Sequence, residues 1–166
     1  MSEKDSVFKG KLKQTGIFSF KDLYSFIYDW LRDEGYDVFE RNYKEKVSGD
    51  SKEIEIKWEA QREISDYFRF LITIDWMIIG MKSVEVQKET KKVKMESGAL
   101  EIKFKGVIVK DYENRWEDSP IWKFFRGIYE KYIIKSRIDD YEIKLITEIE
   151  ELVNQCKAFL AIEAQH

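Results

Sequence analysis

The sequence predicts an α+β protein in which a curved antiparallel sheet of about five to six strands packs on one N-terminal helix and one or two long C-terminal helices. Three observations predict this class: an apolar run with two-residue periodicity, alternating segments on both sides of it, and helical periodicity after residue 111. The chain has 166 residues, enough for one domain with its own core. We place that domain over 1–166, with the sheet and first helix in 7–111 and the C-terminal helical segment in 119–162.

The run from Tyr67 to Met81 is the most apolar part of the chain and predicts the central strand. Its even-numbered side chains are all apolar, whereas the odd-numbered ones are mixed. The even set is Phe68, Phe70, Ile72, Ile74, Trp76 and Ile78. One uniformly apolar face is typical of an antiparallel strand that is covered by helices on that face. Arg69 and Asp75 interrupt a run that is already too short to span a bilayer, so no transmembrane segment is expected.

The residues before this strand predict an edge strand, a helix and a hairpin. Val7–Phe18 alternates weakly between glycines, as edge strands do. Ser19 begins a helix with the spacing of a capping box, and Gly35 is placed to end it. Segments 36–47 and 53–63 alternate on either side of a polar turn, which predicts a hairpin.

The residues after the central strand predict one more strand. The alternation extends beyond Gly80 to Val86, and 96–98, with the sequence Glu-Ser-Gly, is expected to turn the chain back. Leu100, Ile102 and Phe104 form the last strand, and Gly106 indicates a bulge in it.

The C-terminal segment begins a helix at Ser119-Pro120 and carries an apolar stripe that continues to Phe159. One helix over 120–161 would be about 63 Å long, more than the roughly 40 Å diameter of a domain of this size. We therefore expect a break near Lys135, where Ser136 can cap a second helix. An overhanging helix that pairs with a second copy is the alternative.

The order of these elements resembles the helix-grip arrangement of START-like lipid-binding domains, in which a curved antiparallel sheet wraps a long C-terminal helix. The resemblance covers most of the chain as element order, and no motif carries it. The chain departs from that arrangement with one helix rather than two after the first strand and with an extra C-terminal helix. The resemblance implies an apolar ligand held between sheet and helices.

The residue types of common enzyme sites are scarce. His166 is the only histidine and the last residue, which argues against histidine catalysis, a His-containing triad and a His-ligated metal. The scattered glycines form no phosphate loop or dinucleotide motif. Asp75 could receive a ligand's polar end, but alternation places it on the outer face, where a cross-strand lysine can pair with it. We expect no catalytic residue, metal or cofactor; an enzyme acting through carboxylates such as Asp75 is a third alternative.

Charge and cysteine content limit the partners and the compartment. Lys and Arg number 29 against 32 Asp and Glu, with a net charge of -3, which argues against nucleic-acid binding. Cys156 is the single cysteine, which excludes an intramolecular disulfide. Together with a charged first segment that lacks the apolar core of a secretory signal, this predicts a cytoplasmic location.

The large aromatic side chains carry the functional hypotheses. In the predicted fold they converge between sheet and helices, where they either fill the core or form the wall of an apolar pocket. The expected wall consists of Trp30, Trp58, Phe70, Ile72, Trp76, Phe104 and Phe125. The leading hypothesis is a non-enzymatic domain that binds a hydrophobic small molecule there. The alternative is an assembly module that self-associates through its acidic C-terminal helix, whose seam consists of Ile138, Tyr141, Leu145, Ile149 and Leu152.

Overall fold

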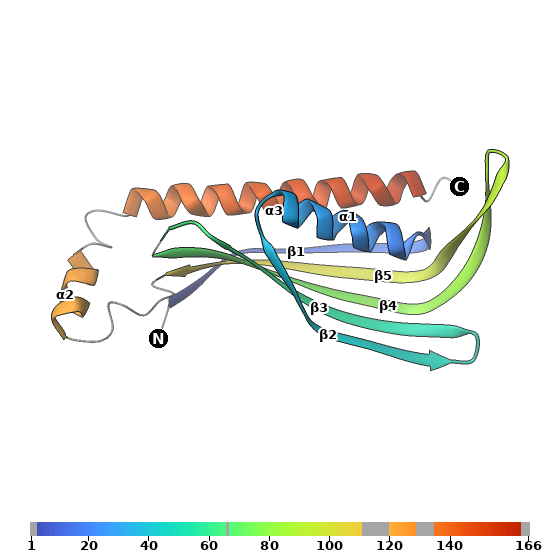
Figure 1. The fold of residues 1–166 in the computed structure, drawn as a ribbon, viewed down its shortest axis with the longest axis horizontal. Coiled ribbons are helices and arrows are strands. Elements are labelled where there is room, and N and C mark those ends of the chain that lie inside the picture. Colours follow the sequence, from blue (N-terminus) through green and yellow to red (C-terminus); the bar gives the residue numbers. More distant parts are fainter. Residues whose placement is uncertain (1–2, 66, 111–119, 129–134, 164–166) are drawn as a thin grey trace.

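The computed structural model describes residues 3–65, 67–110, 120–128 and 135–163. Its elements in chain order are β1 (Glu3–Phe18), α1 (Phe20–Asp33), β2 (Asp37–Ser48), β3 (Ser51–Glu63), β4 (Phe68–Lys88), β5 (Lys91–Lys110), α2 (Pro120–Ile128) and α3 (Lys135–Glu163). The strands form one open five-stranded sheet, and the helices complete an α+β fold (Figure 1). The predicted class is confirmed.

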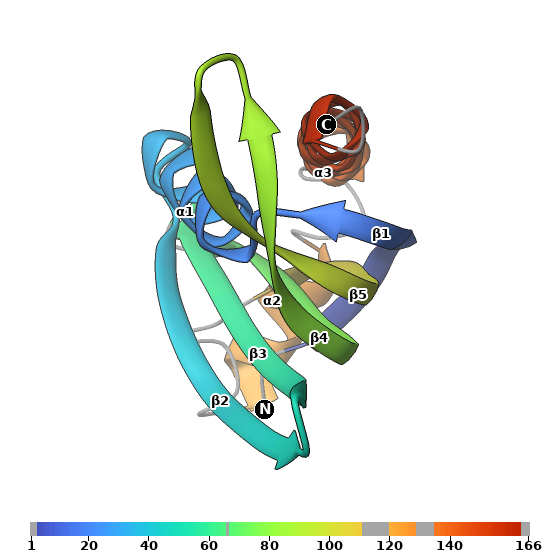
Figure 2. The same ribbon diagram turned by 90° about the vertical axis from the view of Figure 1, so that its right-hand side faces the viewer.

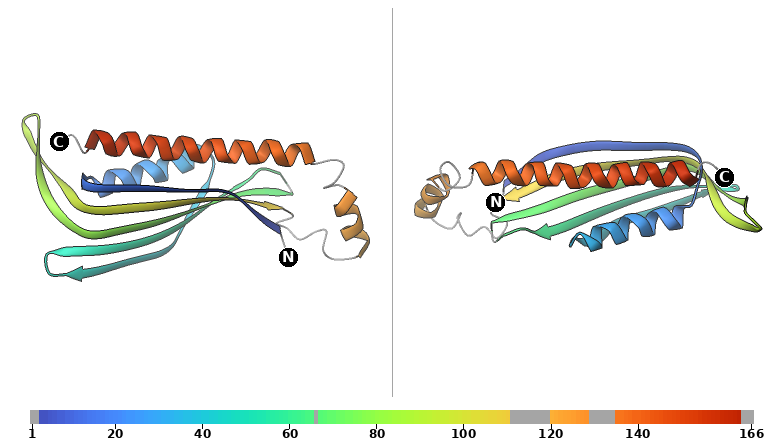
Figure 3. Two further views of the ribbon diagram at one scale, coloured as in Figure 1. Left: turned by 180° about the vertical axis from the view of Figure 1, so that it is seen from behind. Right: turned by 90° about the horizontal axis from the view of Figure 1, so that it is seen from above.

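The sheet has the strand order β1-β5-β4-β3-β2, and every neighbouring pair is antiparallel. The first and last strands are therefore neighbours, and α1 carries the chain from β1 to the opposite edge at β2. α1 and α3 lie on the same face of the sheet (Figures 1 and 2). α3 packs along β1 and β5, whereas α1 lies over the β2 side and also contacts α3 (Figure 3). The fold thus has two layers, with its core between them.

The core confirms the predicted face of the central strand. Each of the six even-numbered side chains from Phe68 to Ile78 is at most 2% exposed. The odd-numbered side chains are half-buried or exposed, and Asp75 is exposed. β3 adds the buried residues Ile54, Ile56 and Trp58 to the same face. Alternation of this kind follows from the two-residue period of a pleated strand covered on one face.

The described part of the C-terminal segment contains two helices, α2 (Pro120–Ile128) and α3 (Lys135–Glu163). The predicted helix start at Ser119 and the chain between the two helices lie outside the described residues. α3 begins at Lys135, so Ser136 lies inside the helix and is not its N-cap. A helix of 29 residues is about 43 Å long and runs beside β1, while the β2–β3 and β4–β5 hairpins extend beyond its C-terminal end (Figure 1). Gly106 of β5 lies directly beneath it, and a Cβ at this position would collide with the Cδ1 methyl of Ile149. The missing side chain therefore permits the close approach of α3.

The predicted turn at 96–98 is wrong. β4 continues to Lys88, and the chain reverses at Glu89, which has a φ of 53°. Gly98 instead lies where the sheet bends: a Cβ there would be 3.0 Å from the carbonyl oxygen of Ile79, and Gly80 has a φ of 65° at a shift of register. The end of the β4–β5 hairpin consequently rises on the helix side of the sheet (Figure 2). The bulge expected at Gly106 lies opposite it in β1, between Ser6 and Phe8.

The N-terminal predictions hold. β1 is an edge strand, and it begins earlier than expected, at Glu3. The Ser19 hydroxyl accepts a hydrogen bond from the Asp22 N–H at 3.3 Å, and Gly35 follows α1 with a φ of 91°. The bent hairpin adds a second cap, because a carboxylate oxygen of Glu96 accepts a hydrogen bond from the Phe20 N–H at 3.0 Å. Glu96 thus joins the hairpin to the start of α1.

Candidate functional site

Five aromatic side chains gather between α1 and the sheet, and we call them the aromatic cluster. They are Phe20, Tyr24 and Tyr28 of α1, Trp58 of β3 and Trp76 of β4. The three α1 residues are four apart, so they share one flank of the helix. Trp58 and Trp76 lie on neighbouring strands and on the same face of the sheet. Helix periodicity and strand register together therefore build the cluster.

Most ring pairs of the aromatic cluster meet edge to face, whereas Tyr24 and Trp76 are tilted by 40° to each other. The centroid distance is 4.7 Å between Tyr24 and Trp58, 5.3 Å between Trp58 and Trp76, and 6.0 Å between Phe20 and Trp76. This geometry places the positive edge of one ring against the negative face of the next, which stabilises each pair. The cluster consequently forms a contiguous aromatic part of the core, in which Trp58 and Trp76 are almost fully buried.

Glu40 of β2 holds two polar atoms of the cluster. One of its carboxylate oxygens accepts hydrogen bonds from the Tyr24 hydroxyl at 3.0 Å and from the Trp58 indole N–H at 3.3 Å. Burial, and secondarily the bond to Glu40, raises the pKa of Tyr24 to about 12. Tyr24 therefore keeps the proton that it donates to Glu40 to a higher pH than a free tyrosine does.

Trp76 differs from Trp58 in the state of its indole N–H. The side chain is 2% exposed, and its N–H has no hydrogen-bond partner in the part of the chain that the structure describes. Leaving a buried donor unpaired costs about 1–3 kcal/mol. Among its apolar rings, the cluster thus contains one N–H donor without a described partner. Many small-molecule sites likewise combine apolar walls with a few polar groups.

The aromatic cluster is open towards β2. Phe20, Tyr24 and Tyr28 are only half-buried, and no residue of β2 is buried. Tyr43 of β2 pairs with Ile56, so its side chain lies on the same face of the sheet, and it is 46% exposed. The cluster is therefore least covered at the β2 edge.

A second polar network, which we call the clamp, lies between the end of α1 and α3. The Glu148 carboxylate of α3 accepts hydrogen bonds from the Tyr36 hydroxyl at 2.8 Å and from the Arg62 guanidinium at 3.0 Å. Arg62 also donates to the carbonyl of Glu34 at 2.7 Å. Burial, and secondarily the charge of Glu148, raises the pKa of Tyr36. The clamp joins the α1–β2 connection, β3 and α3.

The structure brings together part of the predicted wall. Trp58 and Trp76 lie in the aromatic cluster, whereas Phe70, Ile72 and Phe104 are buried elsewhere in the same core, with Phe70 against Tyr141 of α3. Trp30 is half-buried on the flank of α1 that also carries Phe26, whose ring stacks on Phe159 of α3. The last predicted residue, Phe125, lies on α2 and is 49% exposed.

The wall predicted from the sequence did not include Phe20, Tyr24, Tyr28 or Glu40. The four-residue spacing of Phe20, Tyr24 and Tyr28 is a signal that could have identified the α1 side of the cluster. No comparable signal marks Glu40, because a register shift between Glu40 and Asn42 determines which β2 side chains reach the inner face.

The seam assigned to self-association faces the sheet of its own chain. Leu145, Ile149 and Leu152 are fully buried, and Ile138 and Tyr141 are half-buried against the same core. Assembly through this seam would require α3 to leave the sheet. The seam residues are thus already used within the fold.

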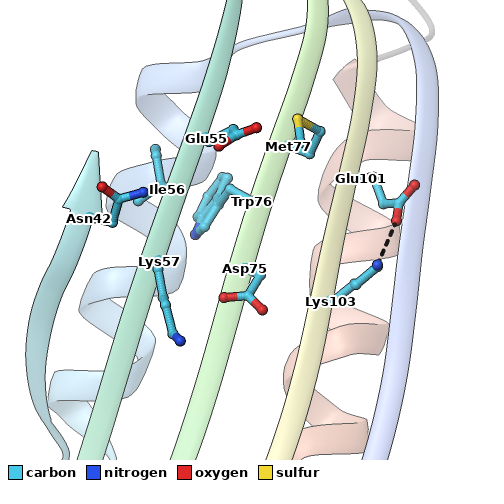
Figure 4. Close-up of a pocket in the computed structure, with 9 residues that line it drawn as sticks. All are labelled: Asn42, Glu55, Ile56, Lys57, Asp75, Trp76, Met77, Glu101 and Lys103. Carbon is cyan, nitrogen blue, oxygen red and sulfur yellow. Dashed lines mark ion pairs between the residues drawn. The ribbon is translucent and has the colours of Figure 1, made fainter. Parts of the chain in front are cut away.

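Asp75 lies on the outer face, as alternation predicted. Its register partners are Lys57 on β3 and Lys103 on β5, and Figure 4 shows its carboxylate between them. The three residues line a shallow hollow of about 450 Å³, in which Lys103 also forms an ion pair with Glu101 at 3.7 Å. An exposed carboxylate among lysines is typical of a solvated sheet surface.

Other reactive groups offer little chemistry. Cys156 is fully buried, and burial raises the pKa of its thiol to about 12, which keeps it protonated. Over residues 3–65, 67–110, 120–128 and 135–163, no group of three or more His, Cys, Asp or Glu side chains is arranged to hold a metal ion. Among the helices described, none is long and apolar enough to cross a membrane.

Comparisons with models of known protein families, with curated proteins and with solved structures find no significant match.

Proposed function

We propose that the protein is a non-enzymatic binding domain that holds a flat apolar molecule, with one hydrogen-bond acceptor, in the aromatic cluster. The observation that carries this proposal is the buried indole N–H of Trp76, which lacks a partner among the described residues. An acceptor oxygen on the ligand would satisfy that donor and recover the cost of its burial. Tyr24 and Trp58 pack edge to face in this structure, and once α1 has moved outward their rings would supply faces on which a flat molecule stacks.

Entry of the ligand requires α1 to move away from the sheet. The α1 rings are half-buried and β2 is exposed, so the β2 edge offers a route that leaves the contacts between α3 and the sheet intact. Glu40 stands at this edge and would orient the polar rim of the site through Tyr24 and Trp58. A mostly apolar site with a few fixed polar groups is the usual design for such ligands.

The helix-grip arrangement is part of the same proposal. The position of β1 beside β5, the placement of α1 and α3 on one face and the bend at Gly98 support a sheet that curves around its helices. The single helix after β1 remains a departure from that arrangement. The single, buried Cys156 supports a reducing cytoplasmic location.

A binding titration with two matched tryptophan variants tests the proposal. The probe is a flat apolar dye that carries a carbonyl group, and native mass spectrometry of the protein purified without detergent looks for a bound molecule. Trp76→Phe removes the N–H, and we expect the dye to bind about tenfold more weakly, as the loss of about 1.4 kcal/mol of hydrogen-bond energy implies.

Trp30→Phe is the control, because Trp30 lies on the opposite flank of α1 and should leave the affinity unchanged. Far-UV circular dichroism and a thermal melt verify that both variants are folded. Equal affinity of the two variants, or no binding by the unaltered protein, would contradict the proposal.

A further inference from the structure

The helix α2 carries an exposed apolar face. Ile121, Phe124, Phe125 and Ile128 have the spacing of residues that share one side of a helix. Their exposed fractions are 67%, 66%, 49% and 38%. Adjacent large apolar residues are normally buried, and a contiguous exposed patch of them marks an interaction surface.

The charged residues of α2 are all basic. Lys123 and Arg126 are the only ionisable residues between Pro120 and Ile128, in a chain whose net charge is -3. At about 100° per residue, Lys123 falls on the side of the helix away from the apolar face. An apolar face with aromatic residues, opposite a basic side, is the pattern of helices that lie in the surface of an anionic membrane.

We propose that α2 docks the protein on an anionic lipid surface, with Phe124 and Phe125 in the interfacial layer and Lys123 at the phosphate groups. α2 lies beyond the end of the sheet, clear of α1 and the hairpins, so a flat surface can reach it (Figures 1 and 3). The proposal depends on α2 alone and stands whether or not the aromatic cluster binds a ligand.

The area of the face favours a lipid surface over a second copy of the chain. With about 200 Å² for a fully exposed large side chain, the four residues offer roughly 450 Å². A stable protein–protein interface buries about 800 Å² on each partner. A bilayer surface has no such threshold, because apolar insertion and attraction of the basic residues to anionic headgroups act together.

Vesicle sedimentation tests this docking. The full chain is mixed with vesicles of phosphatidylcholine alone or of phosphatidylcholine with about 30% phosphatidylserine, at low and at high salt. We expect binding to the anionic vesicles, at least tenfold weaker binding to the neutral ones, and weakening by salt. Phe124→Asp and Lys123→Glu should each weaken binding to anionic vesicles at least tenfold.

Ile143→Asp is the matched control, because Ile143 of α3 is 63% exposed but lies outside α2. This variant should bind vesicles like the unaltered protein, and dye binding at the aromatic cluster should be the same in all the variants. Equal vesicle binding by Phe124→Asp and Ile143→Asp, or no binding to anionic vesicles, would overturn the proposal. Concentration-dependent dimerisation that Phe124→Asp abolishes, without vesicle binding, would assign the face to a second copy instead.

Discussion

At the scale of single residues, Glu40 determines how the aromatic cluster is held. It pairs directly with Trp58 in the register of the β2–β3 hairpin and binds both Trp58 and Tyr24. Because its oxygen accepts two donors, the polar atoms of these rings are satisfied at the edge of the cluster. Trp76 lies one strand further in, beyond the reach of this carboxylate. The contrast between the two tryptophans is therefore a consequence of strand position.

The raised pKa of Tyr24 predicts a loss of stability at alkaline pH. Its phenol has a pKa of about 12 in the folded protein and about 10 when unfolded, so the unfolded state loses the proton first. The stabilisation is complete below pH 10 and is lost as the pH rises through about 12. Urea unfolding at pH 9, 10 and 11 measures the free energy of unfolding along this range.

The variant Tyr24→Phe removes the titrating group, and its free energy of unfolding should fall less steeply between pH 9 and 11 than that of the unaltered protein. Tyr36, whose pKa is also raised, is present in both proteins and therefore contributes equally to the stability that each of them loses at alkaline pH. Parallel curves for the two proteins would show that the Tyr24 hydroxyl carries no such linkage.

At the scale of elements, the predictable parts are those in which one period persists. β4 keeps a two-residue alternation over its whole apolar run, and burial follows that alternation from Phe68 to Ile78. The segment 96–98 has turn composition, yet it lies inside β5, because Gly98 serves a bend of the sheet. Glycine marks both turns and bends, so composition alone does not distinguish them.

The packing of α3 on β5 depends on Gly106, which predicts a specific coupling between two residues. Gly106→Ala places a methyl group against the Cδ1 atom of Ile149 and should destabilise the protein by about 1–3 kcal/mol. Ile149→Val removes that atom and alone costs about 0.5–1.5 kcal/mol. In the double variant the valine should recover part of the loss caused by the alanine.

Urea unfolding of the four proteins forms a double-mutant cycle that measures the coupling energy. Leu145→Ala provides a comparison, because Leu145 is also a buried side chain of α3. A Cβ at position 106 would lie 3.5 Å from the Cδ2 methyl of Leu145, which is an ordinary contact and not a collision. If the effects of Gly106→Ala and Ile149→Val simply add, α3 does not approach β5 as closely as described.

At the scale of the whole molecule, the sequence did not predict how helices and strands that are distant in the chain are placed relative to one another, and this limited the prediction of the site. Periodicity placed Trp58 and Trp76 on the inner face, where they meet. It also placed Phe125 on the apolar stripe that continues into α3, but Phe125 lies on α2, which is a separate helix, and its side chain is 49% exposed. The position of a break and the register of a hairpin are long-range properties, which local spacing does not contain.

The clamp links three parts of the fold that are distant in sequence. We therefore expect its loss to make the separation of the helices from the sheet easier. Arg62 and Glu148 are 15% and 13% exposed, so water screens their charges weakly. Glu148→Gln removes the charge from one partner while it preserves the side-chain shape. We expect a loss of about 1.5–3 kcal/mol in the free energy of unfolding, because Arg62 loses a charge-assisted hydrogen bond in a partly buried site.

Glu45→Gln is the matched control, because Glu45 and Lys52 form an ion pair of 2.8 Å whose side chains are 35% and 47% exposed. Exposed pairs are screened and contribute little, so this variant should unfold at the same urea concentration as the unaltered protein. Hydrogen exchange then locates the effect: Glu148→Gln should accelerate exchange in α1 and in the first half of α3, where the clamp joins the layers. Uniform acceleration over the whole sheet would contradict a local role for the clamp, since it would mean that α1, β3 and α3 open only when the entire protein unfolds.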